Sequence, residues 1–145
     1  MGTARTFNKE TESLSEHLYE SIGEEFYVDG LKAKIIKLKA DPTGTHSNLP
    51  WYSNTSNVYV VLGSDGLAKQ IRIYKNHEPF KDFDWGHDHI NRNTDGRTFP
   101  KLTVHVQEYQ PNVARTGIAA RNMNNEEIEI WGDVIKKLNP NAKLR

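Results

Sequence analysis

The chain has 145 residues, of which 36% are hydrophobic and 26% are charged, with 19 basic and 19 acidic residues. This length suits a single domain with a real core, and the zero net charge argues against a strongly basic protein that coats nucleic acids. The absence of cysteine excludes disulfide bridges, zinc–thiolate sites and a cysteine nucleophile.

The N-terminal segment is predicted to hold one short helix. Residues 1–8 are expected to be a flexible lead without the apolar core of a signal peptide, so any export signal would lie on a longer parent chain. Leu14, Leu18 and Ile22 recur at steps of four. This spacing predicts an amphipathic helix over residues 9–22. No apolar run approaches the roughly 20 residues needed to span a membrane.

Two β-hairpins are predicted to follow. Asp29-Gly30 stands between two β-rich runs and is a strong hairpin signal, and the turn at residues 63–66 joins a second pair of runs. The long polar segment 41–57 is expected to be a loop, in which Trp51 and Tyr52 either pin the loop to the body or form a stacking surface. The expected strands are Glu24–Val28 with Leu31–Leu38, and Val58–Leu62 with Leu67–Tyr74.

Apolar and polar residues alternate in the run Leu67–Tyr74 and in a later run, Leu102–Tyr109. This alternation is typical of an antiparallel sheet with one buried and one wet face. The residues expected to be buried are Ile71, Ile73, Val104 and Val106. The residues expected on the opposite face are Arg72, Tyr74, His105 and Tyr109, with Arg72 and His105 accessible.

A C-terminal helix is predicted after the loop that follows Pro111. Asn124 and Asn125 are suited to cap it. Acidic residues in its first turn and lysines in its last turn interact favourably with the helix dipole and so stabilise the helix. The sequence therefore predicts an α+β fold: an N-terminal helix, a four- to five-stranded mostly antiparallel sheet and a C-terminal helix. Residues 1–145 form one domain, with 9–110 as the core that carries the site and 111–145 as loop and helix.

The stretch from Asp82 to Tyr109 holds three of the six histidines. His87 and His89 are two residues apart, so they face the same side of an extended segment. His105 lies in a second β-rich run, and residues 91–100 between them are expected to be a loop. We therefore expect three imidazoles to lie close together. Imidazole titrates near neutral pH and is the commonest metal ligand.

Two chemistries remain open for these histidines. A His-x-His pair with a distant histidine can supply three metal ligands at about 2.0–2.2 Å, with Asp84 or Asp88 as a possible carboxylate ligand. Metal-free phosphodiester cleavage instead needs a base, an acid and a cation. The candidate cations are Arg72, Arg92, Arg97 and Lys101. For each cation, a solvated surface charge is the simpler interpretation, and each histidine could equally belong to a hydrogen-bond network.

The aromatic residues near this stretch have similar alternatives. Tyr74 and Tyr109 either donate protons and stack on bases or only cover the sheet. Trp85 and Trp131 are expected to pack in the core or at its rim.

The run IRIYKNHEPFKDFDWGHDH, followed by a Gly/Pro loop and VHVQEY, resembles small C-terminal domains of bacterial polymorphic toxins and phage-associated fusions. Those domains carry an I-R-x-Y … D-x-D-W/Y-x-H-x-H … H-x-H signature, and they are similar to the barnase–EndoU–colicin–RelE group of ribonuclease toxins. The resemblance covers about residues 55–110. Gln107 stands where the last H-x-H has its second histidine, which weakens a four-histidine metal site. The site residues that the resemblance marks are Arg72, Asp84, His87, His89 and His105.

The resemblance implies a toxin domain that cleaves RNA, tRNA included, without a metal. His87 or His89 would pair with His105 as base and acid, and Arg72 would hold the phosphate. It also implies a monomer that does not enter membranes, exported within a larger effector as in contact-dependent inhibition, active in the target-cell cytoplasm and blocked by an immunity protein. The residues expected to bind substrate are Tyr74, Tyr109, Arg92 and Lys101. The alternatives are a metal-dependent hydrolase or metal-binding domain built on the same histidines, and a non-enzymatic phage or accessory binding module.

Overall fold

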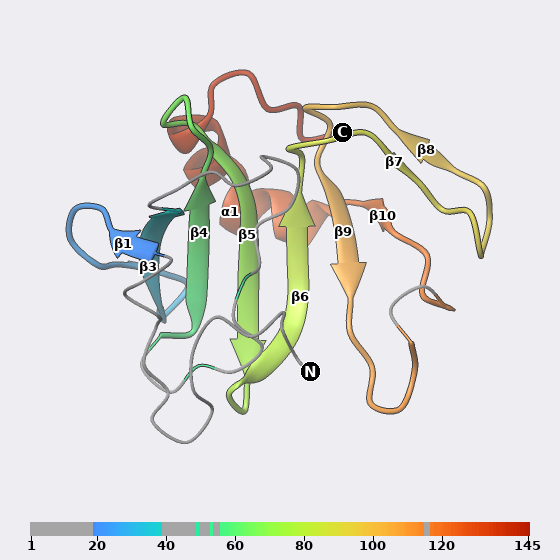
Figure 1. The fold of residues 1–145 in the computed structure, drawn as a ribbon, viewed down its shortest axis with the longest axis horizontal. Helices are drawn as coiled ribbons and strands as arrows, with labels where there is room; N and C mark the ends of the chain where they lie inside the picture. The colour runs from blue at the N-terminus through green and yellow to red at the C-terminus, as the bar shows by residue number, and fades with distance from the viewer. Residues whose placement is uncertain (1–18, 39–48, 50–52, 54–55, 115–116) are drawn as a thin grey trace.

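The computed structural model describes residues 19–38, 49, 53, 56–114 and 117–145. These residues fold as an α+β unit in which one helix lies across one face of a mostly antiparallel sheet (Figure 1). Within these ranges, no helix has the length and apolar character needed to cross a membrane. The elements are β1 (Tyr19–Ser21), β2 (Phe26–Val28), β3 (Leu31–Leu38), β4 (Val58–Leu62), β5 (Ala68–Lys75), β6 (Glu78–Asp84), β7 (His89–Ile90), β8 (Thr98–Phe99), β9 (His105–Glu108), β10 (Arg121–Asn122) and α1 (Asn125–Leu138).

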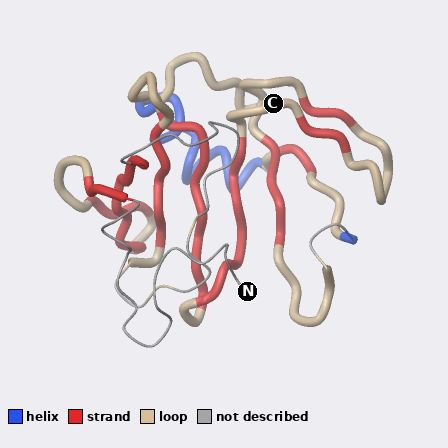
Figure 2. Tube along the Cα trace, viewed as in Figure 1, coloured by secondary structure: helices blue, strands red, loops and turns tan. Residues whose placement is uncertain are grey.

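Eight strands form one sheet in the order β1-β3-β4-β5-β6-β9-β10, with β2 paired to β3 beside this path. The one parallel pair in that sheet, among the described residues, is β3 with β4. Strands β7 and β8 form a separate antiparallel hairpin that lies beyond β9 in the view of Figures 1 and 2. The sheet therefore has more strands than the four to five predicted.

Turn chemistry explains the two predicted hairpins, which are confirmed. Asp29 and Gly30 have positive φ angles of 52° and 78°, as a tight two-residue hairpin turn requires, and β2 pairs antiparallel with β3. Strands β4 and β5 are also antiparallel across the turn at residues 63–66. Strand β2 begins at Phe26, two residues later than expected.

The predicted helix over residues 9–22 is not observed where the structure describes it. Tyr19–Ser21 form strand β1, which pairs with the last residues of β3, and residues 9–18 lie outside the described part of the chain. The helix is predicted from only three apolar residues at helical spacing. Backbone pairing of β1 with the edge of β3 stabilises a strand there instead, because tertiary contacts commonly override local helix propensity.

The predicted strand Leu102–Tyr109 is also shorter in the structure. Strand β9 covers only His105–Glu108, because Leu102 has a positive φ of 78°, a left-handed conformation that a strand does not accommodate. The loop predicted at residues 91–100 contains strand β8.

Helix α1 covers one face of the sheet. Ile71, Phe83 and Val106 are in register across β5, β6 and β9 and belong to the same apolar core as Trp131 of the helix. The rings of Phe83 and Trp131 lie 5.7 Å apart. Trp85 is also fully buried, so the expectation of core packing for both tryptophans is confirmed. The four residues predicted to be buried on this face are buried: Ile71, Ile73, Val104 and Val106.

The N-terminus of α1 is fixed by a capping box and an ionic cluster. The side chain of Asn124 accepts from the Glu127 N–H, and the Glu127 carboxylate accepts from the Asn124 N–H. Arg121 and Lys81 also donate to Glu127, which ties the helix to β10 and β6. Burial alone would raise the pKa of Glu127, but the hydrogen bonds from Arg121 and Lys81 outweigh it and lower the pKa to about 2.

Candidate functional site

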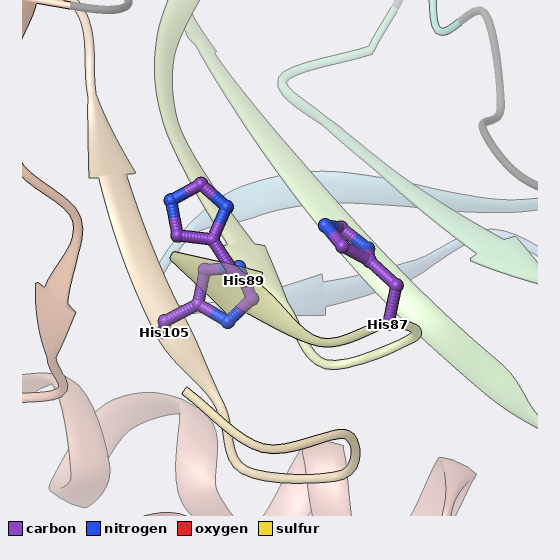
Figure 3. Close-up of side chains that lie close together, drawn as sticks. All are labelled: His87, His89 and His105. Carbon is purple, nitrogen blue, oxygen red and sulfur yellow. The ribbon is translucent and has the colours of Figure 1, made fainter. Parts of the chain in front are cut away.

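Three histidines lie against one another where β6 ends and β9 begins (Figure 3). His87 lies in the bend after β6, His89 begins β7 and His105 begins β9. One possible ligand atom from each ring lies within 4.8 Å of those of the other two. The prediction that the three imidazoles converge is confirmed, and these residues are called the three-histidine cluster below.

The backbone before His87 brings the cluster together. Trp85 is fully buried, and its Nε1–H donates to the carbonyl of Ala68 at 2.8 Å. A Cβ on Gly86 would lie 2.9 Å from the Cβ of Lys69, so glycine allows the chain to turn closely past β5. Asp84 is the register partner of His105, which places β9 directly beside this turn.

The rings are packed on a phenylalanine. His89 and His105 stack with centroids 4.9 Å apart and planes at 19°. His87 meets both edge-on, with centroids 5.6 Å from His105 and 6.2 Å from His89. Phe99, buried in β8, stacks on His105 at 5.2 Å. The hairpin β7–β8 therefore supplies both one member of the cluster and its apolar backing.

Each of the three rings has an oxygen beside one of its nitrogens. Histidines that bind metals commonly donate the N–H of the other nitrogen to such an oxygen, which orients the ring and makes the ligand more basic. The three contacts are His87 Nδ1 with Asp84 Oδ1 at 3.4 Å, His89 Nε2 with Asn91 Oδ1 at 3.0 Å, and His105 Nδ1 with Thr103 O at 3.5 Å. Among the described residues, the cluster that could hold a metal contains these histidines without Asp84 or Asp88.

His105 is only 2% exposed. Burial lowers the pKa of its imidazole to about 4; the Asp84 carboxylate opposes this shift, while the rings of His89 and His87 add to it. His105 is therefore neutral at pH 7. It lies on the polar face as predicted, but the expectation that it is accessible is wrong, because Phe99 and the other rings of the cluster pack against it.

This burial makes the stability of the metal-free protein depend on pH. Between about pH 6.5, where an unfolded histidine titrates, and about pH 4, the unfolded chain binds a proton at His105 that the folded chain excludes. The free energy of unfolding should therefore fall as the pH falls through this window, by about 3 kcal/mol in total.

Urea unfolding in EDTA across this range measures the effect. His105→Gln should flatten the slope relative to that of the intact chain. Glu127, whose pKa falls from 4.5 to about 2 on folding, adds a loss of the same sign below about pH 5 in both proteins, so the difference between their slopes isolates His105. An equally steep slope in His105→Gln would contradict the assignment.

Arg72 lies in a buried network beside the cluster. Its Nε donates to Asp82 Oδ1 at 2.8 Å and its Nη2 to Asp82 Oδ2 at 3.0 Å, a bidentate pair. The Tyr109 hydroxyl donates to Asp82 Oδ2 at 2.6 Å and accepts from Arg72 Nη2 at 3.0 Å. Arg72 Nη1 donates to the carbonyl of Leu49.

The expectation that Arg72 is accessible is therefore wrong. Arg72 is 5% exposed and Asp82 is fully buried, because the same face of the sheet carries a second buried cluster, in which Tyr59 is the register partner of Arg72. The members of that cluster are Ile36, Leu49, Tyr59, Val61 and Tyr74. Burial alone would lower the pKa of Arg72, but Asp82 outweighs it and the pKa is raised. Asp82 and Asp84 are two residues apart on β6, so their Cα atoms lie roughly 7 Å apart. Because Asp84 contacts His87, the Arg72 network adjoins the cluster.

The four residues predicted to bind substrate divide into two pairs. Tyr74 is buried and meets Tyr59 edge-on at 5.5 Å, and burial raises its pKa well above the ordinary tyrosine value. Tyr109 is half-buried in the Arg72 network. Arg92 is exposed in the turn of the β7–β8 hairpin, and Lys101 is exposed in the turn just after β8.

One more exposed cation stands close to the cluster. The guanidinium carbon of Arg97 lies 6.0 Å from the ring centroid of Phe99, and Phe99 in turn stacks on His105. Arg92, Arg97 and Lys101 are therefore the candidate cations that are exposed.

Sequence reasoning missed two residues that build the site. Phe99 stands before Pro100 in a segment that looks like a loop, and only its isolated aromatic character could have marked it. Asn91 is 5% exposed and contacts His89. It is surrounded by loop-type residues, so nothing in the sequence distinguishes it from its neighbours.

No protein-family model matches the chain, and neither a curated protein nor a solved structure matches it. The fold and the site therefore define the class of the protein by themselves: an α+β domain with a three-histidine cluster at one end of its sheet.

Proposed function

We propose that this chain is a toxin-type domain that cleaves phosphodiester bonds in RNA, with a divalent transition metal held by the three-histidine cluster. One observation carries the proposal: three ring nitrogens lie within 4.8 Å of one another. The oxygen acceptor beside each ring supports it further.

The donor set suits zinc or a similar ion. Tetrahedral zinc binds imidazole nitrogen at about 2.0–2.1 Å, which places neighbouring ligand atoms about 3.4 Å apart, so small side-chain rotations would bring the three nitrogens onto one ion. A histidine that binds a metal must be neutral, and it does not have to contact the substrate. The buried His105 can therefore serve as a metal ligand. With Gln107 in place of a fourth histidine, three ligands leave one position open for water, as catalytic zinc sites require.

Such a site can cleave RNA with balanced proton transfers. A divalent ion held by His87, His89 and His105 would supply Lewis acidity and a bound water of lowered pKa, which could act as the base toward a ribose 2′-hydroxyl. In such a cleavage O2′ would bond to phosphorus as the P–O5′ bond breaks, and the proton taken from O2′ would be returned to O5′. The products are a 2′,3′-cyclic phosphate and a 5′-hydroxyl.

Charge beside the cluster supports an anionic substrate. The exposed side chains of Arg92, Arg97 and Lys101 belong to the β7–β8 hairpin and the turn after it, where they would attract phosphates. RNA itself, tRNA included, is proposed from the resemblance to ribonuclease toxins. The same resemblance supports a monomer, delivery within a larger effector into the target-cell cytoplasm and inhibition by an immunity protein.

A second candidate is metal-free cleavage by the same histidines. Its support is the approach of His87 to His105, with ring centroids 5.6 Å apart, and the Asp84 carboxylate, whose Oδ1 lies 3.4 Å from His87 Nδ1. His105 would take the 2′-hydroxyl proton and His87 would give one to O5′. Exchange of both protons with solvent would restore the starting state.

Incubation of the purified domain with tRNA or total RNA separates the candidates. We expect one bound metal per chain, cleavage that EDTA abolishes and Zn²⁺ or Mn²⁺ restores, and no such activity in His89→Ala. His77→Ala, at an exposed histidine in the turn between β5 and β6 that is not part of the cluster, serves as the matched control. Full cleavage in EDTA would favour the metal-free candidate. Intact RNA in every condition would contradict both and favour a non-enzymatic binding module.

A further inference from the structure

Asn91 is a buried side chain in a turn whose following residues are exposed. It is 5% exposed, while residues 92–97 are exposed. Its amide makes bonds in two directions: toward the backbone of Ala120, just before β10, and toward His89 in the three-histidine cluster. Asn91 therefore joins the β7–β8 hairpin to the body of the domain and contacts the cluster at the same time.

The neighbours of Asn91 determine how its amide is oriented. Nδ2 donates to the Ala120 carbonyl at 2.9 Å and to Asp95 Oδ1 at 3.0 Å, and Oδ1 accepts from the Ala120 N–H at 3.0 Å. Exchange of the two amide atoms would turn Oδ1 toward a carbonyl and a carboxylate, and Nδ2 toward an N–H donor. All three bonds would be lost, so the orientation is fixed.

The fixed orientation of the Asn91 amide determines the tautomer of His89. Oδ1 of Asn91 is an acceptor only and lies 3.0 Å from His89 Nε2, so His89 must carry its hydrogen on Nε2 to make this bond. In the neutral ring, the lone pair is then on Nδ1. We propose that Asn91 is a positioning residue that holds neutral His89 in the Nε2–H tautomer, which makes Nδ1 the atom that His89 offers to a metal or proton.

The functional part of this inference rests on the proposed function. Without its hydrogen bond to Asn91, His89 would sample both tautomers. In each tautomer one ring nitrogen carries the hydrogen, so only the other nitrogen can bind a metal. A metal would then have to select the competent tautomer, and partners of this kind typically contribute 10–100-fold to metal affinity. The tautomer itself is a property of the folded chain and is measurable without metal or RNA.

NMR of the metal-free protein tests the tautomer directly. Long-range correlations between ring protons and ring nitrogens, recorded near pH 8 where ordinary histidines are neutral, distinguish a protonated from an unprotonated nitrogen. We expect His89 in the intact chain to show a protonated Nε2 and an unprotonated Nδ1. The opposite pattern, or an even mixture, would overturn the inference whatever the variants do.

Variants test the role of Asn91. Asn91→Leu should mix the two tautomers of His89 and weaken Zn²⁺ binding about 10–100-fold in a competition titration. Asn91→Asp, made together with Asp95→Asn so that two carboxylates do not face each other, keeps an acceptor oxygen toward His89 and should keep the Nε2–H signature, which a merely structural role would not predict. Asn93→Leu, at an exposed asparagine in the same hairpin, is the control and should change neither reading.

The outcomes separate this inference from the proposed function. If Asn91→Leu keeps the tautomer and the Zn²⁺ affinity of the intact chain, the positioning role is wrong. If the intact chain shows the expected tautomer but neither binds Zn²⁺ nor cleaves RNA, the tautomer assignment is supported and the proposed function fails. If Asn91→Leu does not fold, the spectrum of the intact chain and that of Asn91→Asp with Asp95→Asn decide.

Discussion

Arg72→Met is expected to lower the free energy of unfolding by about 3–5 kcal/mol. Asp82 is fully buried, and Arg72 supplies two of the hydrogen bonds to its carboxylate. Methionine would fill much of the same space but would leave a buried negative charge without the two hydrogen bonds from Arg72, although the Tyr109 hydroxyl would still donate to it. The destabilisation comes from the uncompensated Asp82 charge, because desolvation penalises an unpaired ion far more than a paired one.

Urea unfolding of three variants measures this effect. Arg72→Met with Asp82→Asn should recover part of the loss, since the second change removes the unpaired charge. Lys75→Met, at an exposed cation on the same strand, should shift stability by no more than about 0.5 kcal/mol. An Arg72→Met protein as stable as the intact chain, but with weakened RNA binding, would instead restore the phosphate-binding role inferred from the sequence.

The Arg72 network illustrates what alternation along a strand can and cannot predict. The period of two in β5 and in the later run placed Ile71 and Val106 on the core face and Arg72 and His105 on the other, and the register confirms this. Alternation says which residues share a face, but it does not say whether water covers that face. Leu49, Tyr59 and Tyr74 belong to a second buried cluster on this face, so Arg72 and Asp82 are buried there instead of solvated.

Local signals predicted the elements that local chemistry controls. Asp29-Gly30 fixed a hairpin and Asn124 began the helix, because a turn and a cap depend on a few adjacent residues. The parallel pairing of β3 with β4 depends on a connection of 19 residues, 39–57, and no turn motif marks it. In the described part of the chain, strand β1 pairs with β3, a contact between distant residues that no local signal marks.

The convergence of the three histidines was predictable, but their environment was not. His87 and His89 were expected to share a side and His105 to approach from a second strand, and the ring nitrogens do meet. His105 is buried against Phe99, which the β7–β8 hairpin supplies. The strands of this hairpin are only two residues long and lie among turn-type residues, so the sequence does not predict them. The oxygen beside His89 belongs to Asn91, whose contact with Ala120 spans 29 residues.

Alanine at each member of the three-histidine cluster is expected to lower the rate of RNA cleavage by roughly 10²–10⁴. The effect on stability should differ between the three. His105 is 2% exposed and packs on Phe99, so His105→Ala opens a cavity and should also destabilise the fold. The side chain of His87 is 32% exposed, so His87→Ala should lower the rate with little loss of stability.

His89→Ala discriminates between the two proposed chemistries. If the cluster binds a metal, all three alanine variants lose activity together with Zn²⁺ affinity, and excess Zn²⁺ should partly restore His89→Ala, because two ligands remain. If His105 and His87 act as base and acid, His89→Ala should keep most of the rate, and neither EDTA nor Zn²⁺ should change it. Cleavage rates of the three variants at saturating RNA, with EDTA and with graded Zn²⁺, give the result. Activity in His105→Ala equal to that of the intact chain would contradict both chemistries, since each requires that ring.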